Sequence, residues 1–404
     1  MKKDVKYILI SSSLIILIIS GIWGYFKYQK YLEEERIKNA IIKIDFIDPL
    51  EIEFNKDVKL SDLILNINGE LIDDFVIDTS VVGEKEVNFK YINEENIKVP
   101  YKFRLKIVDK TPPVIWLNDT YQINVGTSSK LEDLIMCGDN YDDNPKCEVI
   151  GEYDVNKIGN YKLVFEASDF SGNNTKKEFI LKVVKPRKGS STNATTIPFK
   201  SLYNEYKNDN TTIGIDVSKW QGDIDFSKVK DEGVEVVFIK LGGQNGINGE
   251  YYVDPKFERN IKGFKEVGIP VGLYFYSYAN SIEQAKRDAQ WVISQIKDYD
   301  IDLPIAFDWE NWSKFNNFNV SFNTLTKSAG MFIKTLENYG YSGMLYSSKN
   351  YLEKIWLRNN YLVWLAHYTN KTDYAGKYKC WQRTSSAKIL GITINTVDVD
   401  ICYK

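Results

Sequence analysis

The chain has 404 residues, more than one ordinary domain holds, so we expect two or three domains. A formal net charge of -3 leaves no polybasic surface, which excludes nucleic acid as an expected partner. The single histidine, His367, argues against histidine catalysis and multi-histidine metal sites, whereas 55 acidic residues leave carboxylate chemistry open.

Residues 7–26 form an uncharged apolar stretch that is long enough to cross a lipid bilayer as a helix. Lysines precede it, so we expect residues 1–6 in the cytoplasm and the rest outside the cell, as in a single-pass membrane protein. The alternative is a cleaved signal peptide, but the stretch is longer than usual and no A-x-A-like site follows. The charged residues 27–39 are expected to form a helical stalk.

Residues 40–109 and 110–185 repeat the same landmarks in the same order. KLSDLI at Lys59–Ile64 matches KLEDLI at Lys130–Ile135, and each copy ends on an alternating segment. Period-2 alternation between turn signals predicts short antiparallel strands, hence two all-β sandwiches. They resemble tandem bacterial immunoglobulin-like modules, which implies cell-envelope proteins as partners of these modules.

Neither repeat contains residues arranged as a catalytic motif. The oxygen-rich run Asp139–Asn144 lacks the spacing of an EF-hand, so we expect a solvated loop there. We predict no metal site and no cofactor in the chain. Residues 186–212, which include GSSTNATT, have the composition of a flexible linker.

From residue 213 to residue 404, apolar strands alternate with helical segments, which predicts an α/β barrel. The eight expected strands are Gly214–Val217, Val234–Leu241, Pro270–Tyr276, Pro304–Trp309, Gly343–Tyr346, Leu362–Tyr368, Lys379–Arg383 and Thr396–Ile401. The last two connections, 369–378 and 384–395, show no helical periodicity. Since parallel neighbours need a crossover, we expect a barrel with fewer helices than strands, whose last strand runs antiparallel to the one before it.

Four cysteines form two near pairs, Cys137 with Cys147 and Cys380 with Cys402, without CxxC spacing. Two disulfides and four small buried side chains are both compatible with this spacing. Antiparallel pairing of the last two strands would set Cys380 opposite Cys402. The same register would set Asp398 opposite Thr384, at the end of the barrel where the earlier strands finish.

Acidic residues end three of the predicted strands: Asp216 the first, Asp308 and Glu310 the fourth, and Asp398 with Asp400 the last. Chemistry in α/β barrels takes place at the carboxyl ends of parallel strands, so we expect these carboxylates to converge. Asp308 and Glu310 share one face of a strand, and their repulsion favours one protonated acid. Glycoside hydrolysis requires such a pair, although two solvated acids at a strand end remain the plainer alternative.

The segment Ile213–Lys240, followed in order by VDPKFERN, VGLYFYSYA, LPIAFDWEN, WLAHY, CWQRT and VDVDIC, resembles glycoside hydrolase family 25 lysozymes. The resemblance covers essentially all of residues 213–404. It implies a muramidase that cleaves the β-1,4 bond between N-acetylmuramic acid and N-acetylglucosamine in peptidoglycan glycan strands. It assigns Glu310 as general acid and Asp308, Asp216 and Asp398 as supporting carboxylates, with Asp308 orienting the substrate acetamido group.

Other residues are assigned to the substrate site or differ from the family. Tyr274, Tyr346 and Tyr368 are the preferred glycan contacts, with Trp381 and Asp400 as further substrate-binding residues, whereas His367 is expected to be structural. Departures from the family pattern are Asp400 in place of asparagine, Arg383 after Trp381-Gln382, and LGGQNG in one loop. These departures concern substrate preference more than catalysis.

Three alternatives stay open. Water could attack directly with Asp308 or Asp216 as base. A chitinase-like barrel would require acids at positions occupied by Leu303 and Ala306. A non-catalytic envelope protein could use the barrel only to bind peptidoglycan.

Overall fold

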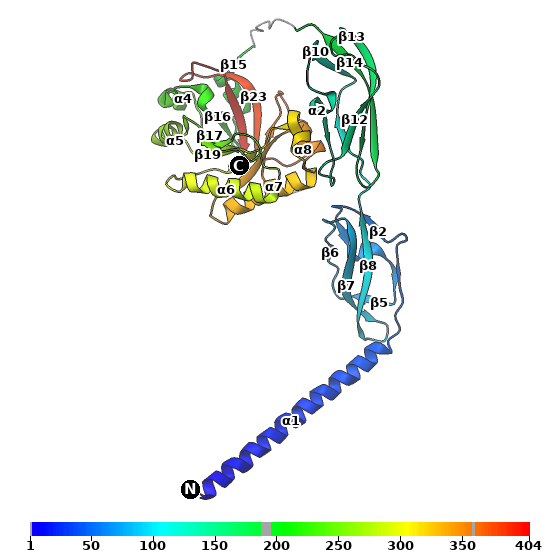
Figure 1. The fold of residues 1–404 in the computed structure, drawn as a ribbon. Helices are drawn as coiled ribbons and strands as arrows, with labels where there is room; N and C mark the ends of the chain where they lie inside the picture. The colour runs from blue at the N-terminus through cyan, green and yellow to red at the C-terminus, as the bar shows by residue number, and fades with distance from the viewer. Residues whose placement is uncertain (1, 187–194, 358–359) are drawn as a thin grey trace. The chain divides into compact units, whose positions relative to one another are not determined.

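The computed structural model describes residues 2–186, 195–357 and 360–404, with side chains from Ile19 onward. The chain divides into two compact units, Met1–Lys110 and Thr111–Lys404 (Figure 1). Residues 187–194 of the predicted linker lie outside the described residues.

The first unit begins with one long helix, α1 (Lys2–Lys38), which confirms the helical character of the predicted stalk. The transmembrane prediction for residues 7–26 is wrong: within the described part of the chain, no helix is long and apolar enough to span a membrane.

A small all-β module completes the first unit. Its elements are β1 (Ile44–Phe46), β2 (Glu51–Glu53), β3 (Val58–Lys59), η1 (Leu60–Leu63), β4 (Ile64–Ile67), β5 (Gly69–Leu71), β6 (Val76–Ile77), β7 (Gly83–Asn93) and β8 (Lys98–Val108). One sheet has the order β2-β8-β7-β5, and β1–β4 and β3–β6 form separate two-stranded pairs. The long hairpin β7–β8 is antiparallel, whereas β2 is parallel to β8.

The second unit begins with a module of the same plan. Its elements are β9 (Val114–Trp116), β10 (Thr120–Asn124), α2 (Leu131–Leu134), β11 (Met136–Gly138), β12 (Lys146–Ile150), β13 (Gly159–Ser168) and β14 (Asn174–Val184). The sheet order is β10-β14-β13-β12, with β10 parallel to β14, and β9 pairs with β11. The repeated sequences KLSDLI and KLEDLI each form a single helical turn, and Leu60, Leu63 and Leu131 of these turns are buried.

The predicted immunoglobulin-like sandwiches therefore need correction, although the all-β character holds. An immunoglobulin-like sandwich packs two antiparallel sheets of three or more strands. Each module instead has one mixed four-stranded sheet, and its other described strands pair only in twos. Those strands have two to four residues, too few to build a second full sheet.

The rest of the second unit is a barrel in which eight strands close into a ring. The strands are β16 (Thr211–Val217), β17 (Val236–Gln244), β19 (Val271–Tyr276), β20 (Ile305–Asp308), β21 (Gly343–Ser348), β22 (Val363–Ala366), β23 (Cys380–Lys388) and β24 (Val397–Tyr403). β16 to β23 pair in parallel in this order, and β24 closes the ring by pairing with both β23 and β16. All eight predicted strands and the barrel are confirmed.

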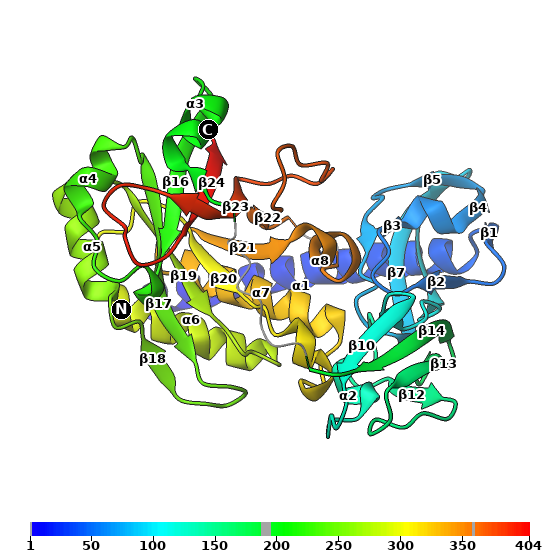
Figure 2. The ribbon, with the colours of Figure 1, turned by 90° about the horizontal axis from the view of Figure 1, so that it is seen from above.

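The barrel helices are α4 (Phe226–Asp231), α5 (Phe257–Glu266), α6 (Ile282–Ile296), α7 (Phe322–Glu337) and α8 (Lys349–Lys354). Short elements accompany them: β15 (Ile197–Pro198), α3 (Phe199–Tyr206), η2 (Lys219–Gln221), β18 (Tyr251–Val253) and η3 (Trp312–Asn317). Figures 1 and 2 show α4 to α7 outside the ring of strands. The helices bury apolar faces, for example Ala285, Ala289 and Val292 of α6, against the outer faces of the strands.

The last strand runs antiparallel to β23, as predicted, and Cys380 lies opposite Cys402. Disulfides join Cys380 to Cys402 and Cys137 to Cys147, so both predicted pairs form. The predicted pairing of Asp398 with Thr384 is wrong by one residue, because a bulge in β23 shifts the register and sets Thr384 opposite Val399. On its other side, Asp398 lies opposite Asp216 of β16.

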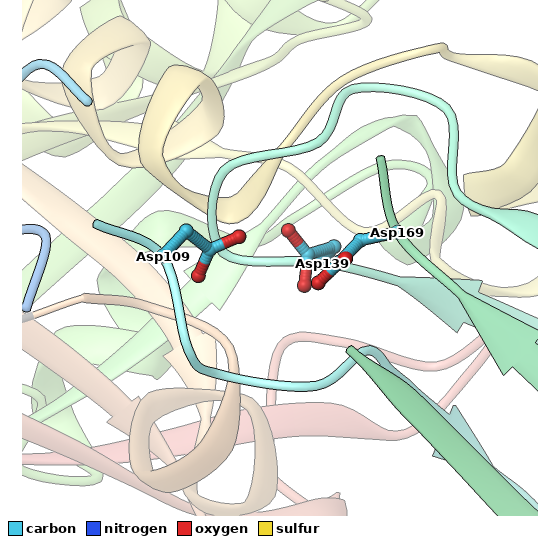
Figure 3. A group of neighbouring side chains, drawn as sticks. All are labelled: Asp109, Asp139 and Asp169. Atoms are coloured by element: carbon cyan, nitrogen blue, oxygen red, sulfur yellow. The ribbon is translucent and has the colours of Figure 1, made fainter. Parts of the chain in front are cut away.

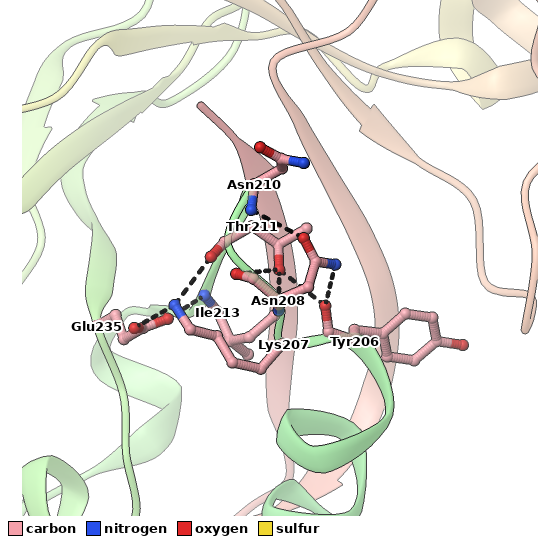
Figure 4. Close-up of polar contacts among 7 residues, drawn as sticks. All are labelled: Tyr206, Lys207, Asn208, Asn210, Thr211, Ile213 and Glu235. Atoms are coloured by element: carbon pink, nitrogen blue, oxygen red, sulfur yellow. Dashed lines mark hydrogen bonds and ion pairs between the residues drawn. The ribbon is translucent and has the colours of Figure 1, made fainter.

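The end of the predicted flexible linker is an ordered part of the barrel, which corrects that prediction. β15 adds to β23, and α3 buries Phe199 and Leu202 in the main core. The turn that follows is held by side-chain hydrogen bonds (Figure 4): the backbone N–H of Asn208 donates to Thr211 Oγ1 at 2.8 Å, and Thr211 Oγ1 donates to the Tyr206 carbonyl at 2.8 Å. These bonds fix the direction in which β16 enters the barrel.

Glu235 ties this turn to the start of β17. Its carboxylate accepts a hydrogen bond from the backbone N–H of Ile213 at 2.8 Å and forms an ion pair with Lys207 (Figure 4). Lys207 also donates to the Thr211 carbonyl at 2.9 Å. The carboxylate therefore satisfies one backbone donor and one ammonium group at the closing edge of the barrel.

We expect Glu235→Ala to lower the free energy of unfolding by about 1–3 kcal/mol, because it removes the side-chain acceptor of a partly buried N–H and the ion-pair partner of Lys207. The measurement is urea unfolding of the full chain. Glu337→Ala, at the exposed end of α7, is the control and should change stability little. Equal urea midpoints for Glu235→Ala and the control would contradict this role of Glu235.

Candidate active site

A cavity of about 240 Å³ lies at the carboxyl ends of the barrel strands. Parallel strands present these ends to the same rim, so residues far apart in sequence meet there. The cavity is lined by Asp216, Ser218, Trp220, Lys240, Tyr274, Tyr276, Asp308, Glu310, Tyr346, Trp364, Tyr368, Gln382 and Asp398. The four carboxylates expected to converge, on Asp216, Asp308, Glu310 and Asp398, thus come together.

Strand alternation explains which side chains face this cavity. Ile305 and Phe307 of β20 and Trp309, which follows the strand, pack in the outer core, whereas Asp308 lines the cavity. Glu310 follows two residues after Asp308 and lines the same cavity. Trp309 is fully buried, and its indole N–H donates to the Ala279 carbonyl at 3.0 Å, which anchors the residue between the two acids.

Asp308 is buried, and its Oδ1 atom has no hydrogen-bond partner in the structure. Burial raises the pKa of Asp308 well above its ordinary value, the charge of Glu310 adds to this rise, and Lys240 opposes it. Burial also raises the pKa of Glu310, although solvent reaches part of this side chain, and Lys240 again opposes the shift. Burial of both acids and the repulsion between their charges therefore disfavour the state in which both are ionised.

Lys240 supplies positive charge to this group of acids, and sequence reasoning missed it. It belongs to β17, and its ammonium group lies 4.8 Å from the centre of the Tyr276 ring and 5.8 Å from that of Tyr274. The available signal was its place inside an apolar strand, VVFIKLGG, where a lysine has no structural reason to be.

Asp216 is held by a hydrogen-bond relay that sequence reasoning also missed. The Gln382 side-chain amide donates to Asp216 Oδ2 at 2.8 Å, while Gln382 Oε1 accepts from the hydroxyls of Tyr346 at 2.8 Å and Tyr368 at 2.9 Å. Burial, with the charges of Asp398 and Asp400, raises the pKa of Asp216 well above its ordinary value. The hydrogen bond from Gln382 opposes part of this rise. Gln382 therefore fixes the orientation of one carboxylate and two tyrosines.

Asp398 is half-buried at the rim, whereas Asp400 lies deeper in the barrel. Burial, followed by the charge of Glu310, raises the pKa of Asp398 to about 7. Asp400 is fully buried and accepts a 2.7 Å hydrogen bond from the indole N–H of Trp364. The substrate-contact prediction for Asp400 is therefore corrected: it lies beneath the cavity, where burial raises its pKa.

The aromatic predictions divide in the same way. Tyr274, Tyr346 and Tyr368 line the cavity as expected. Trp381 does not: it packs in the outer core against Tyr206, and its indole N–H donates to the His367 carbonyl at 2.7 Å. Since Cys380 and Gln382 point inward, alternation turns Trp381 outward, and its predicted glycan contact is wrong.

A second cavity of about 370 Å³ adjoins the first on the side of β21 and β22. Both cavities share Glu310, Tyr346 and Tyr368, so Glu310 lies between two spaces. His367 lines the second cavity, and its Nδ1 atom is 3.0 Å from the Thr372 hydroxyl. An acid between two cavities can serve a bond whose two halves occupy them.

Acidic side chains also meet outside this site, in the second β module. Asp139 and Asp169 are both buried, and Figure 3 shows them side by side. Backbone N–H groups donate hydrogen bonds to both carboxylates: those of Tyr141 and Asp142 to Asp139, and that of Asn173 to Asp169. This bonding gives the pair a structural role within the loops.

The loop Asp139–Asn144 is not the solvated loop that was predicted. The Asp139 carbonyl accepts from the N–H of Phe322 at 2.8 Å, and Asp143 Oδ1 accepts from that of Ser321 at 2.7 Å. These donors begin α7, where helical N–H groups have no acceptor within the helix. The oxygen atoms of this loop therefore serve as hydrogen-bond acceptors for the start of α7.

Residues 215–392 match the family model described as glycosyl hydrolases family 25. The autolytic lysozyme of Clostridium acetobutylicum is 27% identical over 190 residues, which are 46% of this chain and 54% of that protein. The uncharacterized protein YegX of Escherichia coli K12 is 29% identical over 206 residues, which are 48% of this chain and 71% of that protein. The chain thus spans about half the length of the autolytic lysozyme that it matches.

Among solved structures, the modular autolysin LytC of Streptococcus pneumoniae, in complex with a synthetic peptidoglycan ligand, is 27% identical with a TM-score of 0.43. The match covers 59% of this chain and 56% of that one. A family 25 glycosyl hydrolase of Bacillus anthracis is 20% identical with a TM-score of 0.43, covering 53% of this chain and 95% of that one.

The raised pKa of Asp398 predicts a pH dependence of stability. Its folded value of about 7 exceeds its ordinary value of 3.8, so the folded chain binds a proton that the unfolded chain has released between these two values. The contribution of Asp398 to the free energy of unfolding therefore falls as the pH rises from 3.8 to about 7. Asp398→Asn has no such charge, so we expect it to be more stable than wild type at pH 8 but not at pH 4.

Urea unfolding of the full chain at both pH values is the measurement. Asp298→Asn, at the exposed end of the α6 region, is the control and should follow the wild type at both. If Asp398→Asn and wild type differed in stability by the same amount at pH 4 and pH 8, ionisation of Asp398 would not destabilise the fold, and the prediction would be wrong.

Proposed function

We propose that the chain is a peptidoglycan muramidase, because residues 215–392 match the family model of family 25 glycosyl hydrolases. The proposed reaction is hydrolysis of the β-1,4 bond between N-acetylmuramic acid and N-acetylglucosamine in glycan strands. The observation that carries the proposal is the gathering of Asp216, Asp308, Glu310 and Asp398 around one cavity, with Glu310 between two spaces.

Glu310 is the proposed general acid. It reaches solvent and both cavities, and burial raises its pKa, so it can hold a proton near neutral pH and donate it to the leaving sugar oxygen. Asp216 and Asp398 are suited to stabilise the positive charge that develops on the sugar ring, since they line the first cavity side by side from the paired strands β16 and β24.

Asp308 is the proposed acceptor for the N–H of the substrate acetamido group. Its buried Oδ1 atom lacks a partner in the structure, and a buried polar atom without one is costly unless a ligand supplies it. With this N–H bound, the acetamido oxygen attacks the anomeric carbon while the glycosidic bond breaks and Glu310 protonates the leaving oxygen. Water then opens the resulting ring, giving its proton to Glu310, with net retention at the anomeric carbon.

We further propose that the chain works outside the cytoplasm, where its substrate lies. Two disulfides, Cys137–Cys147 and Cys380–Cys402, support this location, because such bonds persist in oxidising compartments. The glycan strands of peptidoglycan are the proposed partner of the barrel.

We expect the full chain to release reducing ends from purified peptidoglycan and Glu310→Gln to slow this release by about 10²–10⁴-fold, since the amide cannot donate a catalytic proton. Glu337→Gln, on the surface of α7, is the control and should retain wild-type activity. Binding of peptidoglycan without any release by the wild type would instead identify a glycan-binding envelope protein.

The assisted route predicts both product geometry and substrate demand. The first product should appear as the β anomer in a proton NMR time course. Removal of N-acetyl groups from the glycan should slow cleavage by about 10²-fold or more, because the internal nucleophile is lost. First appearance of the α anomer would favour direct attack by water, with Asp308 or Asp216 as base.

A further inference from the structure

The connection between β20 and α7, residues 309–321, begins at the residue before Glu310. On the barrel side it is anchored twice: Trp309 donates to the Ala279 carbonyl at 3.0 Å, and the Asn311 side chain donates to the Ser277 carbonyl at 3.2 Å. Its central part is the short helix η3, which includes one residue, Lys314, with non-helical backbone angles. An irregular segment of this kind depends on outside contacts for its position.

The second β module supplies those contacts through Asn316. The Asn316 side-chain amide donates to the carbonyls of Glu132 at 2.7 Å and Ile135 at 2.9 Å, and its oxygen accepts from the N–H of Cys137 at 2.9 Å. One half-buried side chain thus satisfies three backbone groups of the module. Cys137 is itself joined to Cys147, so the donor belongs to a braced strand.

The end of the connection is held by the same module. The N–H groups of Ser321, Phe322 and Asn323 at the start of α7 donate to Asp143 Oδ1, the Asp139 carbonyl and the Asn140 carbonyl. Asp143 Oδ1 also accepts from the Thr324 hydroxyl at 3.2 Å. The module therefore fixes the connection at its middle and at its end.

A row of aromatic rings links the module to the neighbours of Glu310. Trp116 of β9 packs against Tyr351 with ring centres 4.9 Å apart, and Tyr351 stacks on Trp312 at 4.0 Å. Trp312 in turn meets Trp309 edge-on at 4.7 Å. Trp309 and Trp312 flank Glu310 in sequence, so displacement of the first ring is transmitted to the last by contact.

β11 of the module packs against the connection without space for a side chain at Gly138. A Cβ atom added to Gly138 of β11 would lie 2.6 Å from a Phe315 ring atom and 2.7 Å from a Phe322 ring atom. Both rings belong to buried residues, so neither can swing away without disturbing the core. The close approach of β11 to η3 therefore requires glycine for space.

From these contacts we infer that the second β module is a positioning element for the acid: it sets the place of Glu310 relative to Asp308 by holding the connection at Asn316 and through the Trp116–Tyr351–Trp312 stack. The inference rests on the proposed function. Asp308 belongs to β20, whereas Glu310 lies beyond the strand, in a connection that the barrel anchors at its start and the module holds further along. A proton donor displaced by about 1 Å can lose about 10²-fold in rate, so external support of this residue affects catalysis.

The test compares the full-length wild type with Gly138→Val, which wedges β11 away from η3, and Asn316→Ala, which removes the three hydrogen bonds. We expect kcat for release of reducing ends to fall about 10–100-fold in both variants, while KM changes less than about twofold. The pH profile of kcat should also shift, because the surroundings of Glu310 change. Asn208→Ala, which removes hydrogen bonds from the turn before β16, is the control and should keep wild-type kcat.

A second pair tests the ring stack. Trp116→Ala should lower kcat, and Trp116→Phe should restore most of it, because an aromatic ring still packs on Tyr351. This pair also decides the question if Gly138→Val fails to fold. Folded variants with wild-type kcat and pH profile would overturn the inference, whereas a wild type that releases no reducing ends would overturn the proposed function itself.

Discussion

The site depends on the reversal of a single strand. β24 pairs antiparallel with both β23 and β16, and this closes the barrel where no helical crossover links the last two strands. The same pairing sets Asp398 opposite Asp216 and brings Asp400 against Trp364 in the interior. If the last strand ran parallel to the others, Asp398 and Asp400, which lie near its start, would sit at the end of the barrel opposite the other acids. The reversal therefore decides how many carboxylates the rim can gather.

Gathering them has an electrostatic cost that the surrounding residues limit only in part. Asp216, Asp308, Asp398 and Asp400 all have raised pKa values, chiefly through burial. Lys240 offsets the charges of Asp308 and Glu310, and Gln382 stabilises Asp216 by a hydrogen bond. The remaining cost keeps the pKa of each of these acids above its ordinary value. A site that must donate a proton and then accept one back benefits from this state, so the instability and the chemistry have one origin.

Sequence reasoning succeeded where local pattern determines structure. The eight strands and the convergence of Asp216, Asp308, Glu310 and Asp398 followed from alternation and from the order of elements, whereas the cysteine spacing left open whether disulfides form. It failed on Trp381 and Asp400, although the signal existed: inward-facing Cys380 implies inward-facing Gln382 and outward-facing Trp381. The one-residue error at Asp398 could not be foreseen, because a bulge depends on how two strands fit together. The predicted membrane span is overturned, because among the described residues no helix is long and apolar enough to cross a membrane.

The docking of the second β module shows a different limit. The oxygen-rich run Asp139–Asn144 has the composition of a solvated loop, and its purpose becomes clear only beside the uncapped start of α7. Gly138 and Asn316 are equally uninformative alone, since their meaning lies in a contact between segments about 180 residues apart. Glu310, the proposed general acid, is held on one side by the barrel and on the other by the second β module. Under the proposed function these two parts of the second unit act together, and the fit of β11 against η3 matters to the chemistry at Glu310.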